Sequence, residues 1–166
     1  IREFGRDARN LDLVPEAEFL LYVARDVQLI EEMTRPALAS SDVVIADRFL
    51  YSAEVLARFG RGLSLSFLRP VLDEAARGLA PDIVILCDVD PHVARARRKA
   101  ARIVTPDKKP PSRKGLTGVG LQTRLREGYR SLAAADPSRW VVVDNDGELE
   151  AQLRRVTSLI TRAVSE

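Results

Sequence analysis

The sequence predicts an α/β fold, a doubly wound parallel sheet with flanking helices. Three short runs rich in β-branched apolar residues, 43–46, 83–87 and 140–143, are typical of strands buried in a parallel sheet. The segments between and after them repeat apolar residues at helical spacing, most clearly over 149–160. Strands that alternate with helices predict a sheet covered on both faces. The 166 residues suffice for one core, so we expect one domain over 1–166.

Composition excludes several classes of protein. A net charge of +2 is too small to argue for a nucleic-acid partner. No apolar run reaches the roughly 18 residues that a membrane span needs, and the first residues do not resemble a signal peptide. The single cysteine, Cys87, excludes a disulfide within the chain, and its apolar surroundings predict a buried, inert thiol. We therefore expect a protein of the cytoplasm that binds neither membrane nor nucleic acid.

The first long helix is expected from about Pro15 to Ala39, because a helix tolerates proline near its start. Tyr22, Arg25 and Asp26 share one face of this helix, so an aromatic ring and two opposite charges project together. From periodicity alone, the ordinary interpretation is an exposed ion pair beside a half-buried tyrosine.

The apolar run 43–46 ends at Asp47 and Arg48, which makes this pair a candidate site. In open α/β sheets, ligands bind just beyond the carboxyl ends of the strands. The alternative is that both side chains are merely a solvated end of the strand. A short helix that carries Ser52, and then a Gly-Arg-Gly turn, are expected to follow.

The predicted strand 83–87 leads directly into another helix. Asp90 is expected to cap that helix, with Pro91 at its first position. His92, the only histidine, is then an exposed residue of the first turn, and no metal site is expected there.

This helix is densely basic and includes Arg97, Lys99 and Arg102. Prolines and lysines crowd the residues after it, so the composition predicts a loop within 102–120. The ordinary interpretation of such a basic run is a solvated face.

Several short motifs occur in the order in which one known family has them. They are Asp47-Arg48-Phe49 followed by Ser52, Gly60-Arg61-Gly62, Asp88-Val89-Asp90-Pro91, Arg126-Glu127-Gly128-Tyr129 and Trp140-Val141-Val142-Val143-Asp144. Over nearly the whole chain this set resembles the thymidylate kinase family of P-loop nucleoside-monophosphate kinases. The resemblance implies a P-loop kinase-like fold and a nucleoside monophosphate as partner, and it leaves a homodimer open.

The family's phosphate-binding loop does not occur in the sequence. No Gly-x-x-x-x-Gly-Lys-Ser/Thr motif is present, and residues 1–5 resemble the family's Arg-Glu-Pro-Gly-Gly, which follows its second strand. The resemblance therefore implies a domain that lacks its first strand and first helix. ATP and Mg²⁺ would require that segment, because backbone N–H groups at a helix N-terminus cradle the phosphates.

The resemblance also assigns catalytic roles. Arg48 would clamp the acceptor's phosphate, and Asp47 would position that phosphate or a magnesium-bound water. Arg97 would neutralise charge during transfer, together with a lid that begins with Lys99 and Arg102. The residues implied to line the acceptor pocket are Glu3, Tyr22, Arg25, Asp26 and Ser52.

Four positions depart from the family pattern. Asp26 occupies the place of an arginine that bonds to a base carbonyl, while Arg25 stands one position early, about 100° around the helix. Ala53, Leu56 and Ala57 replace side chains that hydrogen-bond the nucleotide. Because a carboxylate would repel O4 of thymine, we expect that thymidine monophosphate is not the preferred acceptor.

Two function classes follow. The first is a kinase that transfers phosphate from ATP to a nucleoside monophosphate, which requires an upstream phosphate-binding loop. The second is a non-catalytic module of the same family, used for binding or assembly in a larger protein. The pocket substitutions favour the second, and the retained Asp47-Arg48 pair and basic lid favour the first. A deoxynucleoside kinase is a weaker third interpretation.

Overall fold

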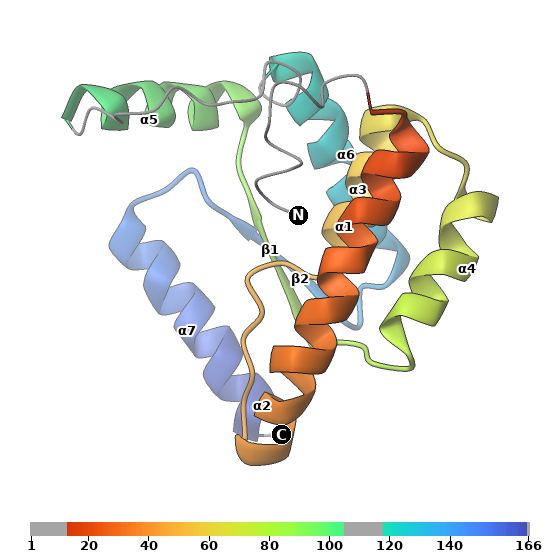
Figure 1. Cartoon of the computed structure of the whole chain (residues 1–166). Helices are drawn as coiled ribbons and strands as arrows, with labels where there is room; N and C mark the ends of the chain where they lie inside the picture. Colours follow the sequence, from red (N-terminus) through yellow and green to blue (C-terminus); the bar gives the residue numbers. More distant parts are fainter. Residues whose placement is uncertain (1–12, 105–117, 166) are drawn as a thin grey trace. The chain divides into compact units, whose positions relative to one another are not determined.

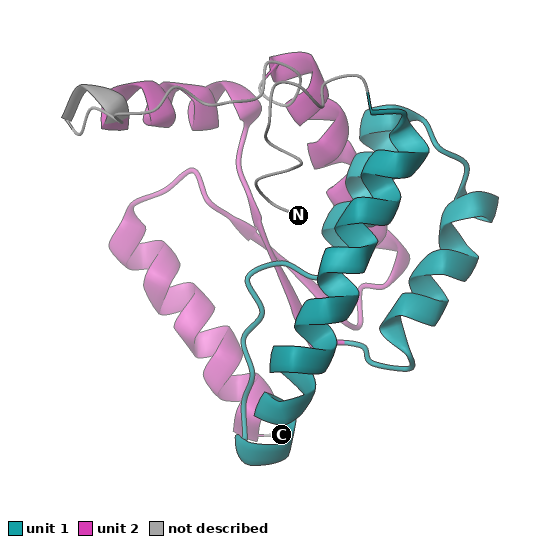
Figure 2. Ribbon diagram, in the orientation of Figure 1, with its two compact units in different colours: residues 1–80 teal, residues 81–166 magenta. Residues whose placement is uncertain are grey.

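The computed structural model describes residues 13–104 and 118–165 (Figure 1). The chain divides into two compact units, residues 1–80 and 81–166, which we describe separately (Figure 2). The described part of the first unit is helical, and the second unit carries two strands. No described helix is long and apolar enough to span a membrane. The single domain expected over 1–166 stays a prediction.

Three consecutive helical segments form the long helix that the sequence predicts. They are α1 (Pro15–Leu29), the π-helix η3 (Ile30–Thr34) and α2 (Arg35–Ser40). Pro36 accounts for the π-turn, because its ring has no N–H to donate and would clash with a carbonyl one turn earlier. The helix expected over 15–39 is therefore confirmed, with a widened turn in its second half.

The first unit continues with α3 (Tyr51–Val55), the π-helix η4 (Leu56–Gly60) and α4 (Leu65–Ala76). Ser64 caps α4 by accepting a backbone N–H of its first turn, and Arg77 ends it in the left-handed conformation. The predicted short helix after Arg48 thus exists, although its second half is a π-helix.

The core of the first unit lies among α1, α3, η4 and α4. Phe19 and Val23 of α1 and Ile30 of η3 form one buried stripe along the long helix, whereas Leu20 is exposed. The rings of Phe19 and Phe67 meet edge to face, with 5.9 Å between their centroids. The buried members of this core are Phe19, Val23, Ile30, Leu50, Ala53, Ala57, Leu68, Leu72 and Ala75. This packing holds α1 against α3, the two helices that carry predicted pocket residues.

The strand predicted at 43–46 is not a strand in the described structure. These residues connect α2 to α3 without forming a ladder, and Ile45 is 74% exposed. A strand exists only where a neighbour takes up its backbone N–H and C=O groups. No described segment pairs with 43–46, so the apolar pattern alone was insufficient.

The second unit contains a small parallel sheet. β1 (Val84–Asp88) pairs with β2 (Trp140–Asp144), with Val84 opposite Trp140 and Asp88 opposite Asp144. Its helices are α5 (Pro91–Val104), α6 (Val119–Ala135) and α7 (Leu149–Ser165). Helix α6 contacts both strands and α7 contacts β2. The α/β class and these two strands are confirmed, whereas the doubly wound sheet and the missing first strand stay predictions.

Two finer expectations change in this unit. Cys87 is exposed rather than buried. The other residues of β1 are half-buried, so the apolar run predicts the strand but not the burial of every side chain in it. Helices occupy both ends of the loop expected within 102–120, because α5 extends to Val104 and α6 begins at Val119. Residues 105–117 of the predicted lid lie outside the described residues.

Candidate functional site

Tyr22, Arg25 and Asp26 of α1 form one connected group in the first unit. The guanidinium carbon of Arg25 lies 5.2 Å from the centroid of the Tyr22 ring. Nε of Arg25 donates to Oδ1 of Asp26 at 2.7 Å, and Nη2 of Arg25 contacts the same oxygen. The ring and the two charges therefore do project together, as the helical spacing predicts.

The Arg25–Asp26 pair is not the fully exposed ion pair of the ordinary interpretation. Asp26 is only 6% exposed, and its Oδ2 has no hydrogen-bond partner among the described residues. Burial raises the pKa of Asp26, although the hydrogen bond from Arg25 opposes that shift. The accessible end of this pair is therefore the guanidinium of Arg25 rather than the carboxylate of Asp26.

Tyr22 lines a shallow hollow between α1 and the segment formed by α3 and η4. Almost none of its space is open to a water-sized molecule, far less than the roughly 300 to 1,000 Å³ typical of small-molecule sites. Its lining residues are Pro15, Glu18, Phe19, Tyr22, Ala53, Leu56, Ala57 and Arg61. The aromatic ring and the three positions that depart from the family pattern thus share one hollow.

Glu18 and Arg61 form an ion pair in the lining of this hollow. Nε of Arg61 donates to Oε2 of Glu18 at 2.7 Å, and Nη2 of Arg61 donates to Oε1 at 3.4 Å. Hydrogen bonding to Glu18 raises the pKa of Arg61. Sequence reasoning missed this pair. The available signal was that Glu18 precedes Tyr22 by one helical turn and so shares its face.

Asp47 and Arg48 are exposed in the connection before α3, and Ser52 lies in the first turn of that helix. Arg48 adopts φ +81°, a left-handed conformation that few non-glycine residues take up. Such strain persists where the surroundings or a function require it. The next residue of α3, Ala53, belongs to the hollow, so these three predicted residues lie beside it in sequence.

Arg97 of α5 is engaged with backbone carbonyls in the second unit. Its Nη1 donates to the carbonyl oxygen of Asn145 at 2.5 Å, and its Nη2 donates to that of Asp146 at 2.9 Å. Arg97 therefore ties α5 to the loop between β2 and α7. Lys99 is exposed on the same helix. Glu3 and the side chain of Arg102 lie outside the described residues, so their predicted roles stay predictions.

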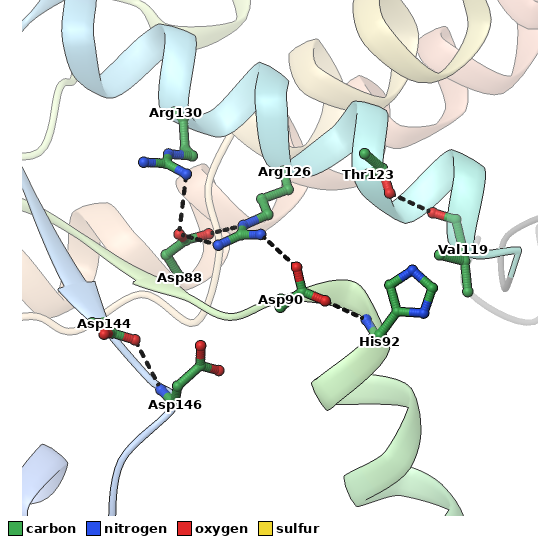
Figure 3. A network of polar contacts seen from close by, with 9 residues as sticks. All are labelled: Asp88, Asp90, His92, Val119, Thr123, Arg126, Arg130, Asp144 and Asp146. Atoms are coloured by element: carbon green, nitrogen blue, oxygen red, sulfur yellow. Dashed lines mark hydrogen bonds and ion pairs between the residues drawn. The ribbon is translucent and has the colours of Figure 1, made fainter.

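A second polar network, which sequence reasoning did not place in a site, surrounds Arg126 of α6 (Figure 3). Nε and Nη2 of Arg126 donate to the two oxygens of Asp88, at 2.8 and 3.0 Å. Nη1 of Arg126 donates to Oδ2 of Asp90 at 3.0 Å. Oδ1 of Asp90 accepts the backbone N–H of His92 at 2.9 Å, which confirms Asp90 as the cap of α5.

The Asp88–Arg126 pair predicts a specific dependence of stability on pH. Hydrogen bonding from Arg126 holds the pKa of Asp88 below its ordinary value of 3.8. The pair stabilises the fold fully at pH values above the pKa that Asp88 has in the unfolded chain. This stabilisation is lost as the pH falls through the lower pKa that Asp88 has in the folded protein. We expect Asp88→Asn to lower the thermal midpoint at neutral pH, and the difference from wild type to shrink once the pH falls below the unfolded value. Melts across this acid range test it, and a constant difference would contradict it.

The described residues contain no group of three or more His, Cys, Asp or Glu side chains placed to hold a metal ion. His92 is exposed, as the sequence predicts.

Comparison with known proteins decides the family. The sequence model described as thymidylate kinase matches residues 1–156. The chain belongs to the thymidylate kinase family. The thymidylate kinase of Nitratidesulfovibrio vulgaris is 35% identical over 166 residues, which is 100% of this chain and 74% of that protein. The thymidylate kinase of Deinococcus radiodurans is 38% identical over 146 residues, 86% of this chain and 68% of that protein.

Membership of this family supports a nucleoside-monophosphate kinase function, with ATP binding and a place in nucleotide biosynthesis. The resemblance noted from the motifs is confirmed over the whole chain. The non-catalytic alternative, which rested on the pocket substitutions, is not favoured, because the likeness to thymidylate kinases covers the whole chain.

Proposed function

We propose that this chain forms the acceptor-binding and lid-bearing part of a kinase that transfers a phosphoryl group from Mg-ATP to thymidine monophosphate. The observation that carries this proposal is the whole-chain likeness to thymidylate kinases, joined to a hollow that contains Tyr22 and adjoins Arg25. The Gly-x-x-x-x-Gly-Lys-Ser/Thr motif, whose backbone N–H groups cradle a triphosphate, does not occur in the sequence, so no residue is assigned here to the ATP phosphates.

The argument for thymidine begins with the placement of Asp26. The sequence argument against thymidine takes Asp26 as the group that faces the base. In the structure Asp26 is buried and bound to Arg25, which supports Arg25 rather than Asp26 as the group that faces the base. The guanidinium of Arg25, beside the Tyr22 ring, can donate to a base carbonyl, while the ring stacks on the base.

The opposite wall of the hollow also suits thymine. Leu56 is the half-buried apolar residue of this wall, and the buried Ala53 and Ala57 pack behind it. A methyl group gains from such surface, whereas an exocyclic amino group would lose its hydrogen bonds to water there. The 5-methyl group of thymine is therefore the better match for this wall.

The charged residues supply the remaining roles. Arg48 binds the acceptor's phosphate through two parallel N–H bonds. Asp47, in the connection before α3, and Ser52, in the first turn of α3, orient that phosphate. Charge that develops on the transferring group is offset by Lys99 and Arg102, because phosphoryl transfer depends on positioning and positive charge more than on covalent chemistry. Glu3 completes the acceptor pocket.

A coupled ADP-release assay on the whole protein that contains this chain tests the proposal. With Mg-ATP, thymidine monophosphate should give the highest kcat/KM among the common nucleoside monophosphates. Arg25→Met should reduce the preference for thymidine over cytidine monophosphate, since one base contact would be lost. No turnover with any monophosphate would refute the kinase, and a clear preference for another base would refute the assignment of Arg25.

A further inference from the structure

One guanidinium joins three elements of the second unit (Figure 3). Arg126, near the middle of α6, uses Nε and Nη2 on Asp88, the last residue of β1, and Nη1 on Asp90, the cap of α5. Paired N–H contacts to one carboxylate are among the strongest and most directional hydrogen bonds in proteins. We call Asp88, Asp90 and Arg126 the Arg126 hub.

Apolar packing holds only the first turn of α5, which contacts α6. Pro91 is buried and Val93 and Ala94 are half-buried, whereas the residues from 95 to 101 are all exposed, so no apolar face anchors the rest of the helix. Among its longer side chains, Arg95, Arg98 and Lys99 are exposed. The direction of α5 therefore depends on polar contacts in its first half, namely the hub at Asp90 and the carbonyl contacts of Arg97.

We propose that Arg126 is a positioning residue that sets the direction of α5, and with it the place of the basic side chains that α5 carries. This proposal rests on the proposed function, in which those charges meet the transferring phosphoryl group. Arg126 acts through Asp90 and touches no reacting group. A small displacement of a positive side chain lowers kcat, because such a charge stabilises the transition state only where it lies close to the negative charge that develops there.

Asp90→Asn is the sharpest probe, because asparagine still caps a helix but loses the charge that pairs with Arg126. The matched control is Asp136→Asn, which weakens another aspartate–arginine pair, with Arg139 at 3.7 Å, in the turn after α6. Steady-state kinetics use the whole protein with Mg-ATP and thymidine monophosphate. Hydrogen–deuterium exchange on the same proteins without nucleotide follows the backbone amides of α5 and α7.

We expect Asp90→Asn to lower kcat by about 10- to 100-fold, with the KM for thymidine monophosphate and the thermal midpoint close to wild type. Arg126→Met should lower kcat at least as much, because it also breaks the contacts with Asp88. The double variant should lower kcat no further than Arg126→Met, because the contact with Asp90 is already lost there. Amides of α5 should exchange faster in Asp90→Asn while those of α7 stay unchanged. Asp136→Asn should match wild type throughout.

Two results would overturn the proposal. One is wild-type kcat in Asp90→Asn, and the other is a fall in kcat that only tracks a loss of folded protein. A wild-type protein that phosphorylates no monophosphate would instead refute the proposed function. In that case hydrogen–deuterium exchange still tests the role of the Arg126 hub. Unchanged exchange rates of the α5 amides in Asp90→Asn would show that Arg126 does not fix the direction of this helix.

Discussion

Arg48→Ala is expected to weaken binding of the acceptor monophosphate by about 2 to 4 kcal/mol while the fold stays intact. Arg48 is exposed and does not belong to the core of the first unit, so folding does not depend on its side chain. Truncation to a methyl group removes a charge and two parallel N–H donors from the proposed phosphate site. Calorimetric titration of thymidine monophosphate into the whole protein measures the loss.

The backbone at Arg48 makes Arg48→Gly an informative companion. A φ of +81° is unfavourable for any residue with a Cβ, by about 1 kcal/mol, whereas glycine adopts it freely. Arg48→Gly should therefore raise the free energy of unfolding and still lose acceptor affinity as Arg48→Ala does. If replacing Arg48 stabilises the fold but abolishes binding, then the arginine serves binding rather than stability.

Arg77→Gly is the matched control, because Arg77 is the other described non-glycine residue at positive φ, with +47°. It ends α4 and has no place in the proposed site. We expect a similar gain in stability with unchanged acceptor affinity. Unchanged affinity in Arg48→Ala would refute the phosphate clamp, and an equal loss in Arg77→Gly would show that the effect is not specific.

The parts of the fold that local physics determines were predictable. Asp90 and Pro91 open α5 as expected, because a side-chain cap and a fixed φ act within one turn of the chain. The stripe through Phe19, Val23 and Ile30 likewise follows from helical periodicity. The strand expected at 43–46 failed for the opposite reason, since a strand needs a neighbour that no local pattern supplies.

The details of the site depend on side-chain directions and on contacts between distant residues. Alignment with the family pattern placed Asp26 at the position that faces the base. In the structure, side-chain packing buries Asp26 and leaves Arg25 beside Tyr22. Arg126 and Asp88 are separated by 38 residues, so their pairing has no local signature. Arg97 binds carbonyl oxygens, which every residue possesses, and no sequence pattern can indicate such a partner.

Arg61→Ala is expected to destabilise the protein by about 2 to 4 kcal/mol, because it removes the guanidinium that neutralises a buried carboxylate. The side chain of Glu18 is 6% exposed and that of Arg61 is 29% exposed, so solvent screens the pair only partly. The pair also joins the first turn of α1 to the residue that follows η4. Urea unfolding of wild type and variant gives the change in the free energy of unfolding.

A double variant separates the attraction within the pair from the penalty of an uncompensated buried charge. Glu18→Met combined with Arg61→Met replaces both charges with apolar side chains of similar length. Such exchanges of buried ion pairs are often close to neutral, so the double variant should recover most of the stability that Arg61→Ala loses. Arg77→Ala breaks the exposed pair between Arg77 and Glu31 and should cost less than about 1 kcal/mol. If Arg61→Ala costs no more than Arg77→Ala, the Glu18–Arg61 pair is only a surface contact and does not hold η4 against α1.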